Sequence, residues 1–440
     1  MKTNKDQMMK SKRIKLKLWI SALLLFSATW VNAQENKLLT IETCYQLAEQ
    51  NYPLIKQYAL LDQSRDYNLQ NAARAWLPQI ALNAKATYQS EVVKIPIDFS
   101  QIPQLNIDIP EINKDQYGVT LDITQNLWDG GATKARSEQI KAKSQVESEQ
   151  LNVSLYAVKD RINQLFFGIL MSDALLDQNR ILQDELAQSY AQVKSLVGGG
   201  LANQSDLDAV KVEQLKAKQL ATQVRHNRKA YLAMLSAFIG QKLDEQSELQ
   251  KPLAQSTLPK ENLRPELSLF DRQSNLFEAQ NCFVKADLMP KFGLFLTGGY
   301  GNPGLNMLKE GFTPYYIGGL RMSWNISSFY TYKNRQSDIK TQQGNLAVQR
   351  EIFLFNSDLQ AESKQHELEK YSELLADDDE IIALRQSVKR ATAAKMNNGT
   401  ANINDLIRET NAEALAKQNK IMHELELLQA IYNLKYITNN

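Results

Sequence analysis

The chain has 440 residues with 51 basic and 49 acidic side chains, a formal net charge of +2, and 43% hydrophobic residues. This near-neutral balance does not indicate the strongly basic surface that is typical of nucleic-acid-binding proteins. The two cysteines, Cys44 and Cys282, are too few for a disulfide framework, and we expect both to be small buried apolar residues.

The first 33 residues have the pattern of a secretory signal peptide. Seven basic residues precede an apolar stretch of 14 residues, 18–31, which is too short for a comfortable membrane span. Val31-Asn32-Ala33 then supplies small residues at the positions that a signal peptidase reads. A membrane anchor is the less favoured alternative. Cleavage would leave a mature chain with 44 basic and 48 acidic residues, a net charge of −4.

One sequence pattern occurs twice in the chain. Residues 200–207 and 399–406 both read G-x-A-N-x-x-D-L, 199 residues apart. A repeat of this period is too long for a solenoid unit. It predicts two tandem homologous halves, residues 34–245 and 246–440.

The first half is predicted to begin with a helix and a pair of strands, and the second half repeats the order. Strict alternation of apolar and polar residues marks four segments, at about 78–89, 117–128, 290–300 and 315–327. Each is about the length of a tilted membrane strand, and the loops that join the pairs, the longer at 89–116, should face outside. Aromatic residues lie near the strand ends, as in an interfacial girdle: Trp76, Tyr88, Tyr117, Trp128, Tyr300, Tyr315, Tyr316 and Trp324. An antiparallel sheet in a soluble domain is the alternative, because it shares the alternation.

A long coiled-coil-like helix is predicted after each pair of strands. A run of apolar residues in the first half steps by four and three, as in a coiled-coil seam: Leu151, Leu155, Val158, Ile162, Leu165 and Ile169. Residues 132–197 contain no proline, and residues 332–396 are similarly uninterrupted. We expect these helices to end at turns at 198–206 and 397–405, from which helices return at about 205–238 and 404–437.

The strands are the predicted membrane-crossing elements, because no apolar run of 18 or more residues follows the signal peptide. Four strands cannot close a barrel, since single-chain membrane barrels start at about eight strands, and an open sheet would leave unpaired backbone groups in lipid. Three copies of the chain would supply twelve strands. Lys85, Asp122 and Arg321 fall on the polar faces of their strands and are expected to face a water-filled lumen.

One order of elements occurs twice in the chain: helix, Leu77-Pro78, strand, strand, Asn126-Leu127-Trp128-Asp129-Gly130-Gly131, long helix, Gly-x-Ala turn and returning helix. Over about residues 38–437, this doubled order resembles that of the TolC-type outer-membrane efflux proteins. The resemblance implies an α+β membrane protein that forms a homotrimer, with a twelve-stranded β-barrel in the outer membrane of a Gram-negative bacterium and a periplasmic α-helical barrel. The second half departs from the pattern at Ile326-Ser327-Ser328-Phe329-Tyr330.

The resemblance also implies a function. Proteins of this kind are the outer-membrane channels of tripartite efflux or type I secretion systems. They passively conduct substrates that arrive from an inner-membrane transporter of the RND, ABC or MFS type and its periplasmic adaptor, the membrane fusion protein. A periplasmic or surface coiled-coil scaffold without a pore is the alternative, although it explains the helical seams and not the alternating strands.

The repeated turns hold the predicted functional residues. By the resemblance, Asp405 matches an acid of the closed periplasmic gate, and Asp206 is its counterpart in the first half. Capping of the following helix is the alternative role for each Asp. Arg408 stands where the best-known member has another acid, and it could pair with Asp206 or Asp405 as a latch. The resemblance implies adaptor docking at the two turns, at Gly200, Leu201, Ala202, Gly399, Thr400 and Ala401.

No catalytic, cofactor or metal site is predicted, and we do not expect an enzyme. His226, His366 and His423 lack metal-ligand spacing and are expected on solvated helix surfaces. Gly198-Gly199-Gly200 does not continue into the Gly-Lys-Ser/Thr of a phosphate-binding loop. The acidic run at residues 377–380 is expected to be a solvated helix face or a local break.

Overall fold

The computed structural model describes residues 38–93, 113–254, 261–307, 309 and 311–439. The predicted signal peptide and the middle of the loop at 89–116 lie outside the described residues. In chain order the elements are α2 (Ile41–Asn51), α3 (Lys56–Ala73), β1 (Gln79–Tyr88), β2 (Asp115–Trp128), α4 (Ala132–Gly198), α5 (Gln204–Ile239), α6 (Pro265–Ala286), β3 (Lys291–Asn302), β4 (Thr313–Ser323), α7 (Ser328–Asn397) and α8 (Ile403–Thr438).

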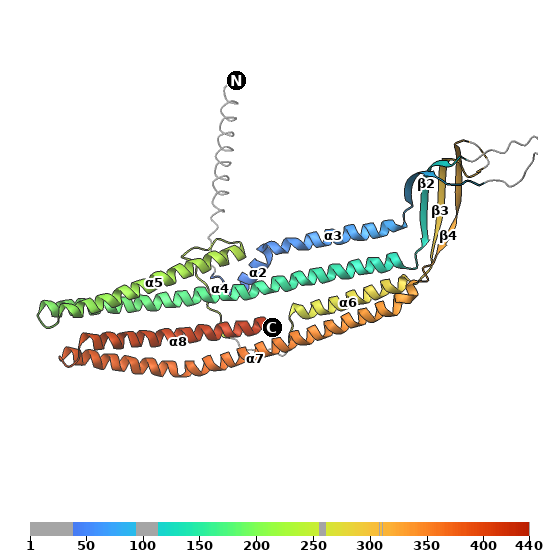
Figure 1. Ribbon diagram of the computed structural model, residues 1–440. Coiled ribbons are helices and arrows are strands. Elements are labelled where there is room, and N and C mark those ends of the chain that lie inside the picture. The colour runs from blue at the N-terminus through green and yellow to red at the C-terminus, as the bar shows by residue number, and fades with distance from the viewer. Residues whose placement is uncertain (1–37, 94–112, 255–260, 308, 310, 440) are drawn as a thin grey trace, which may run out of the picture.

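The protein is mostly helical, with a small antiparallel sheet at one end (Figure 1). The helices α4 and α7 have 67 and 70 residues, about 100 Å each at the usual rise per residue. Short 3-10 turns, Pro53–Ile55 and Arg74–Trp76, flank α3. Among the described residues, no helix is both long enough and apolar enough to span a membrane.

The long helix α4 lies at the centre of the array. It contacts α3 and α6 toward the sheet, and α5 and α8 toward the opposite end, where α7 packs on α8. The returning helices therefore cover only the half of each long helix that is remote from the sheet (Figure 1). Near the sheet, α3, α4, α6 and α7 form a single row in which α3 and α7 are the outer members.

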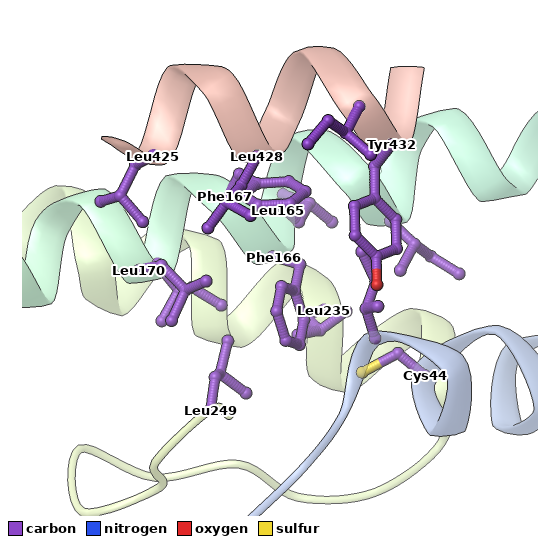
Figure 2. Packing of buried hydrophobic residues seen from close by; sticks show 14 of the residues in the cluster. Cys44, Leu165, Phe166, Phe167, Leu170, Leu235, Leu249, Leu425, Leu428 and Tyr432 are labelled. Atoms are coloured by element: carbon purple, nitrogen blue, oxygen red, sulfur yellow. The ribbon is translucent and has the colours of Figure 1, made fainter. Parts of the chain in front are cut away.

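The main core lies midway along the array, where the hairpins α4–α5 and α7–α8 meet. All six residues of the predicted seam on α4 are buried, and Phe166 beside them is fully enclosed. Figure 2 shows Phe166 and its neighbours on α4 packed between Leu235 of α5, Cys44 of α2 and Tyr432 of α8. Apolar burial at about 25 cal/mol per Å² stabilises this junction, which fixes the two hairpins α4–α5 and α7–α8 against each other.

The two cysteines differ in their surroundings. Cys44 is buried, as expected, and burial raises the pKa of its thiol to about 12, with a smaller contribution from Glu42. The prediction for Cys282 was wrong, because its side chain is exposed on α6. This helix packs on α4 and α7, but Cys282 and its neighbour Phe283 lie on a side that stays exposed in the described part of the chain.

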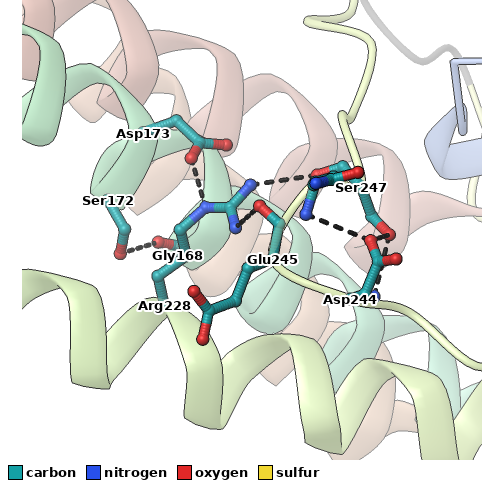
Figure 3. A network of polar contacts seen from close by, with 8 residues as sticks. Gly168, Ser172, Asp173, Arg228, Asp244, Glu245 and Ser247 are labelled. Atoms are coloured by element: carbon teal, nitrogen blue, oxygen red, sulfur yellow. Dashed lines mark hydrogen bonds and ion pairs between the residues drawn. The ribbon is translucent and has the colours of Figure 1, made fainter.

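A buried arginine fastens the segment that follows α5. Arg228 on α5 pairs with Asp173 on α4 and donates hydrogen bonds to the carbonyl oxygens of Glu245 and Ser247, each at 2.9 Å (Figure 3). The guanidinium group holds several acceptors at fixed angles, as its planar fork allows. These bonds hold residues 240–249 against the α4–α5 hairpin at the level of the core.

Candidate functional site: the two helical turns and the exposed sheet

The turn after α4 has the geometry of a helix that is closed by glycine. Gly200 has φ 73°, and its N–H bonds to the carbonyl oxygen of Val197 at 3.1 Å. The N–H of Leu201 reaches back to the carbonyl oxygen of Leu196 at 2.9 Å. This pair of bonds is the Schellman motif, in which glycine takes the left-handed conformation that costs other residues energy.

The turn after α7 repeats this geometry. Gly399 has φ 74°, and its N–H bonds to the carbonyl oxygen of Met396 at 3.0 Å. The N–H of Thr400 bonds to the carbonyl oxygen of Lys395 at 2.9 Å. The predicted docking residues thus occupy matching positions in two structurally equivalent turns. Leu201 is 80% exposed, so the turn after α4 presents an apolar side chain to solvent.

Both predicted gate carboxylates cap a returning helix. The carboxylate of Asp206 accepts the N–H of Asn203 at 3.0 Å. That of Asp405 accepts the N–H of Asn402 at 3.2 Å, and the N–H of Asp405 donates to the side chain of Asn402 at 2.9 Å. This reciprocal pair is a capping box, which satisfies N–H groups that a helix start leaves free. The capping role is therefore present at both positions.

Arg408 pairs with its own helix. Its guanidinium lies 3.4 Å from the carboxylate of Asp405 and 3.2 Å from that of Glu409. Its side chain is 70% exposed, so the pair with Asp405 is a surface pair of small energy. Of the two partners considered for Arg408, Asp405 is the one in contact within the chain.

A small apolar cluster brings the two turns together. Its buried members come from the ends of α4, α5 and α8 that adjoin the two turns: Val193, Leu207, Val210, Ile403, Leu406 and Ile407. Both turns therefore lie at the same end of the helical array, opposite the sheet (Figure 1). A change at one turn is expected to be felt at the other through this contact.

The sequence did not predict a buried ionic cluster above the turns. The ammonium group of Lys389 on α7 lies 2.7 Å from Glu185 of α4 and 2.9 Å from Glu413 of α8. Lys417 approaches Glu413 at 2.6 Å. Burial raises the pKa of Glu413, but the hydrogen bonds and charges of Lys417 and Lys389 outweigh it and the pKa is lowered. In the sequence, only Glu413 and Lys417, four residues apart on one helix, indicated an ion pair. The other partners lie far apart in sequence.

The acidic run at residues 377–380 lies inside α7, which passes through it without a break. The prediction for His423 was wrong, because its ring is largely covered and its Nδ1 lies 2.8 Å from the buried carboxylate of Asp378. Lys420 pairs with Asp379 at 2.6 Å. These contacts tie α7 to α8. The described residues contain no group of His, Cys, Asp and Glu side chains that could hold a metal ion.

The sheet places Lys85, Asp122 and Arg321 on one face. Strand order is β1-β2-β3-β4, all antiparallel, with Asp122 opposite Thr297 and Lys85 opposite Gly118. Since opposed residues share a face, even positions of β2 and odd positions of β1, β3 and β4 lie together. Asp122 accepts hydrogen bonds from Thr297 at 2.5 Å and from Asn83 at 2.8 Å, and the guanidinium of Arg321 lies 4.9 Å from the ring centre of Phe295.

The opposite face of the sheet is apolar and exposed. Its large side chains come from all four strands: Ile80, Leu82, Tyr88, Tyr117, Val119, Leu121, Phe292, Leu294, Leu296, Tyr300, Tyr316, Leu320 and Met322. Of the described helical elements, the 3-10 turn Arg74–Trp76 packs on the sheet, and it does so only at the end of β2, where Gln125 and Asn126 donate to carbonyl oxygens of the turn. The predicted strand at 315–327 ends earlier, at Ser323, and Trp324 beyond it donates its indole N–H to the carbonyl oxygen of Leu288 at 2.9 Å.

Comparison with known proteins gives one family and one fold. Residues 44–241 match the model of the outer membrane efflux protein family. No curated protein sequence matches the chain significantly.

Solved channels share the fold at low sequence identity. The outer-membrane channel OprN is 15% identical with a TM-score of 0.67, over 90% of both chains. CusC is 13% identical with a TM-score of 0.67, over 90% of this chain and 91% of its own. The MtrE outer-membrane channel of Neisseria gonorrhoeae, in its open state, is 13% identical with a TM-score of 0.65, over 91% of this chain and 89% of its own. The match over residues 44–241 and the shared fold confirm the predicted resemblance to the outer membrane efflux proteins.

Proposed function

We propose that the protein is an outer-membrane efflux channel that works as a homotrimer and passively conducts substrates to the exterior. The observation that carries the proposal is the sheet, which has one polar and one apolar face and exposes both. An apolar face of this width is unusual in a soluble monomer. The apolar face would contact lipid on the outside of a barrel, and the polar face would line a water-filled lumen.

The edge strands of the sheet and the outer helix α7 support an arrangement of three copies around an axis. Among the described strands, β1 and β4 each have one neighbour only, and unpaired strand edges are costly in lipid. In a trimer, β4 of one protomer would pair with β1 of the next and close twelve strands. The outer helix α7 also carries an exposed stripe with coiled-coil spacing: Val348, Ile352, Phe355 and Leu359. We infer that this stripe packs on α3 of the neighbouring protomer.

The helical turns would form the periplasmic tip. Two equivalent turns per chain, repeated by the trimer, would give six similar contact points for a periplasmic adaptor that links the channel to an inner-membrane transporter of the RND, ABC or MFS type. Export by efflux or type I secretion would follow from that partnership. Asp206 and Asp405 would each be repeated three times around the axis and form an acidic gate, beside their capping role.

Extraction separates the channel from a scaffold without a pore. The channel predicts that the protein fractionates with the outer membrane, needs detergent for release, and has the mass of a trimer by native mass spectrometry. A scaffold predicts release by high salt or high pH. Release without detergent as a monomer would refute the proposal.

Docking at the turns is tested by adding bulk there. Ala401→Trp should abolish efflux in a drug-accumulation assay while trimer assembly is kept. Ala230→Trp, an equal change at an exposed position on α5, is the control and should keep efflux. Normal efflux in Ala401→Trp would contradict the docking assignment.

A further inference from the structure

A groove of about 750 Å³ lies between α3 and α4, next to the sheet. Arg65 and Asn68 of α3 line one side, Arg136 and Lys143 of α4 line the other, and Phe283 of α6 and Lys291 of β3 complete it. Its volume is that of a site for a small organic molecule, typically about 300–1,000 Å³. No predicted functional residue belongs to it.

The charges in the groove are unbalanced. Arg65 is neutralised by Asp62 at 2.6 Å and Asp66 at 2.9 Å. Lys143 lies 3.7 Å from Glu147, the one acidic residue of the lining. Arg136 and Lys291, in contrast, have no ion-pair partner among the residues that the structure describes. Two cationic side chains therefore lack a counter-charge.

The rest of the lining suits an organic body with a polar head. Ala72 is buried, and it forms an apolar surface with Ile140 and Phe283. The side-chain amides of Asn68 and Asn71 can donate hydrogen bonds to an anionic group. A pocket with an apolar floor and a few convergent polar groups is the usual form of a small-molecule site.

The groove is continuous with the polar face of the sheet. Lys291 is the first residue of β3 and lies opposite Ser323 of β4. Since side chains alternate along a strand, Lys291 shares its face with Thr297, and so with Asp122 and Arg321. The groove thus opens on the side that would face the lumen, not on the apolar side that would face lipid. This placement favours a soluble anion over a lipid headgroup.

We propose that this groove is a lumenal binding site for amphiphilic organic anions, molecules with a carboxylate, sulfonate or phosphate group on an apolar body. Arg136 and Lys291 bind the anionic group, and Ile140 and Phe283 contact the body. The proposal rests on the proposed channel function, because the lumenal position follows from it. It adds a substrate class to that function.

Fluorescence anisotropy of a dye with the purified trimer in a non-ionic detergent tests the site. The probe is 5-carboxyfluorescein, and cationic rhodamine 6G is the comparison dye. The double variant Arg136→Gln/Lys291→Gln should bind carboxyfluorescein at least about tenfold more weakly, because two charge-assisted hydrogen bonds are lost. Its binding of rhodamine 6G should not weaken.

Lys134→Gln is the matched control, since Lys134 is exposed on α4 two residues from Arg136 and is not part of the lining. It should bind carboxyfluorescein as the wild type does. Arg136→Lys/Lys291→Arg keeps both charges and should restore most of the affinity, which separates charge from folding. Equal binding by the wild type and the neutralised variant, or none by the wild type, would overturn the site. Bilayer conductance of the wild type tests the channel itself, so the two failures are distinguishable.

Discussion

The ionic cluster around Lys389 predicts a measurable link between the two hairpins. Lys389 on α7 connects Glu185 of the first hairpin to Glu413 of the second at 2.7 and 2.9 Å. The Lys389→Met substitution keeps most of the apolar stem and removes the charge. It leaves Glu413, whose side chain is 7% exposed, with Lys417 as its remaining cation.

The size of the effect follows from burial. Removal of one partner from a fully buried ion pair costs about 3–5 kcal/mol. Lys389 is 22% exposed and Glu413 keeps one partner, so we expect a smaller loss, about 2 kcal/mol. This loss corresponds to a roughly 30-fold increase in the equilibrium constant for local opening.

Hydrogen–deuterium exchange measures that opening directly, because it reports local as well as global stability. The amides of α8 near Glu413 and of α4 near Glu185 should exchange faster in Lys389→Met by about this factor. Lys395→Met is the control on the same helix, because Lys395 is exposed and has no ion-pair partner among the described residues. Unchanged exchange in Lys389→Met, or an equal effect in Lys395→Met, would refute the link.

Three further predictions follow from the polar contacts. The folded pKa of Glu413 lies below its ordinary value of 4.5, so its stabilising contribution is present above that value and lost as the pH falls through the lowered pKa. The protection factors of α8 amides, which correct for the intrinsic pH dependence of exchange, should therefore fall below about pH 4.5, and the fall should be smaller in Glu413→Gln. Arg228→Met should lower stability by about 2–4 kcal/mol, since two backbone carbonyls and Asp173 lose a buried cation. Faster proteolysis of residues 240–249 is the readout, and Lys218→Met, at an exposed position on the same helix, is the control. Asn402→Ala should destabilise the start of α8 by about 1 kcal/mol, seen as faster exchange of its first turn, and a normal rate there would show that the cap contributes little.

The parts of the fold that were predictable are those with a local sequence signal. The seam on α4 and the alternation in the strands are periodic patterns, which record which side of an element is apolar. The turns carry glycine at positions with positive φ, and such positions are recognisable from sequence. Lys85, Asp122 and Arg321 share a face for the same reason, since alternation fixes the parity of each strand.

The remaining features depend on how distant segments meet. Glu185 and Lys389 are 204 residues apart, and no periodicity reports that their helices touch. His423 was expected in solvent because its partner, Asp378, lies on another helix. Cys282 was expected in the core because the residue type is usually buried, but the side of α6 on which it lies is exposed among the residues that the structure describes. The groove between α3 and α4 was not predictable, because it forms only where these two helices pack together.

Single-channel recording in planar lipid bilayers tests whether the protein is a gated channel. We expect the purified wild-type trimer to give discrete, small, cation-selective openings. Asp405→Ala should widen them, whereas Asp208→Ala, a change at a nearby acidic residue outside the capping box, should not. Bilayers that stay silent with the wild type and with Asp405→Ala, although the trimer inserts, would contradict the assignment of this chain as a gated channel.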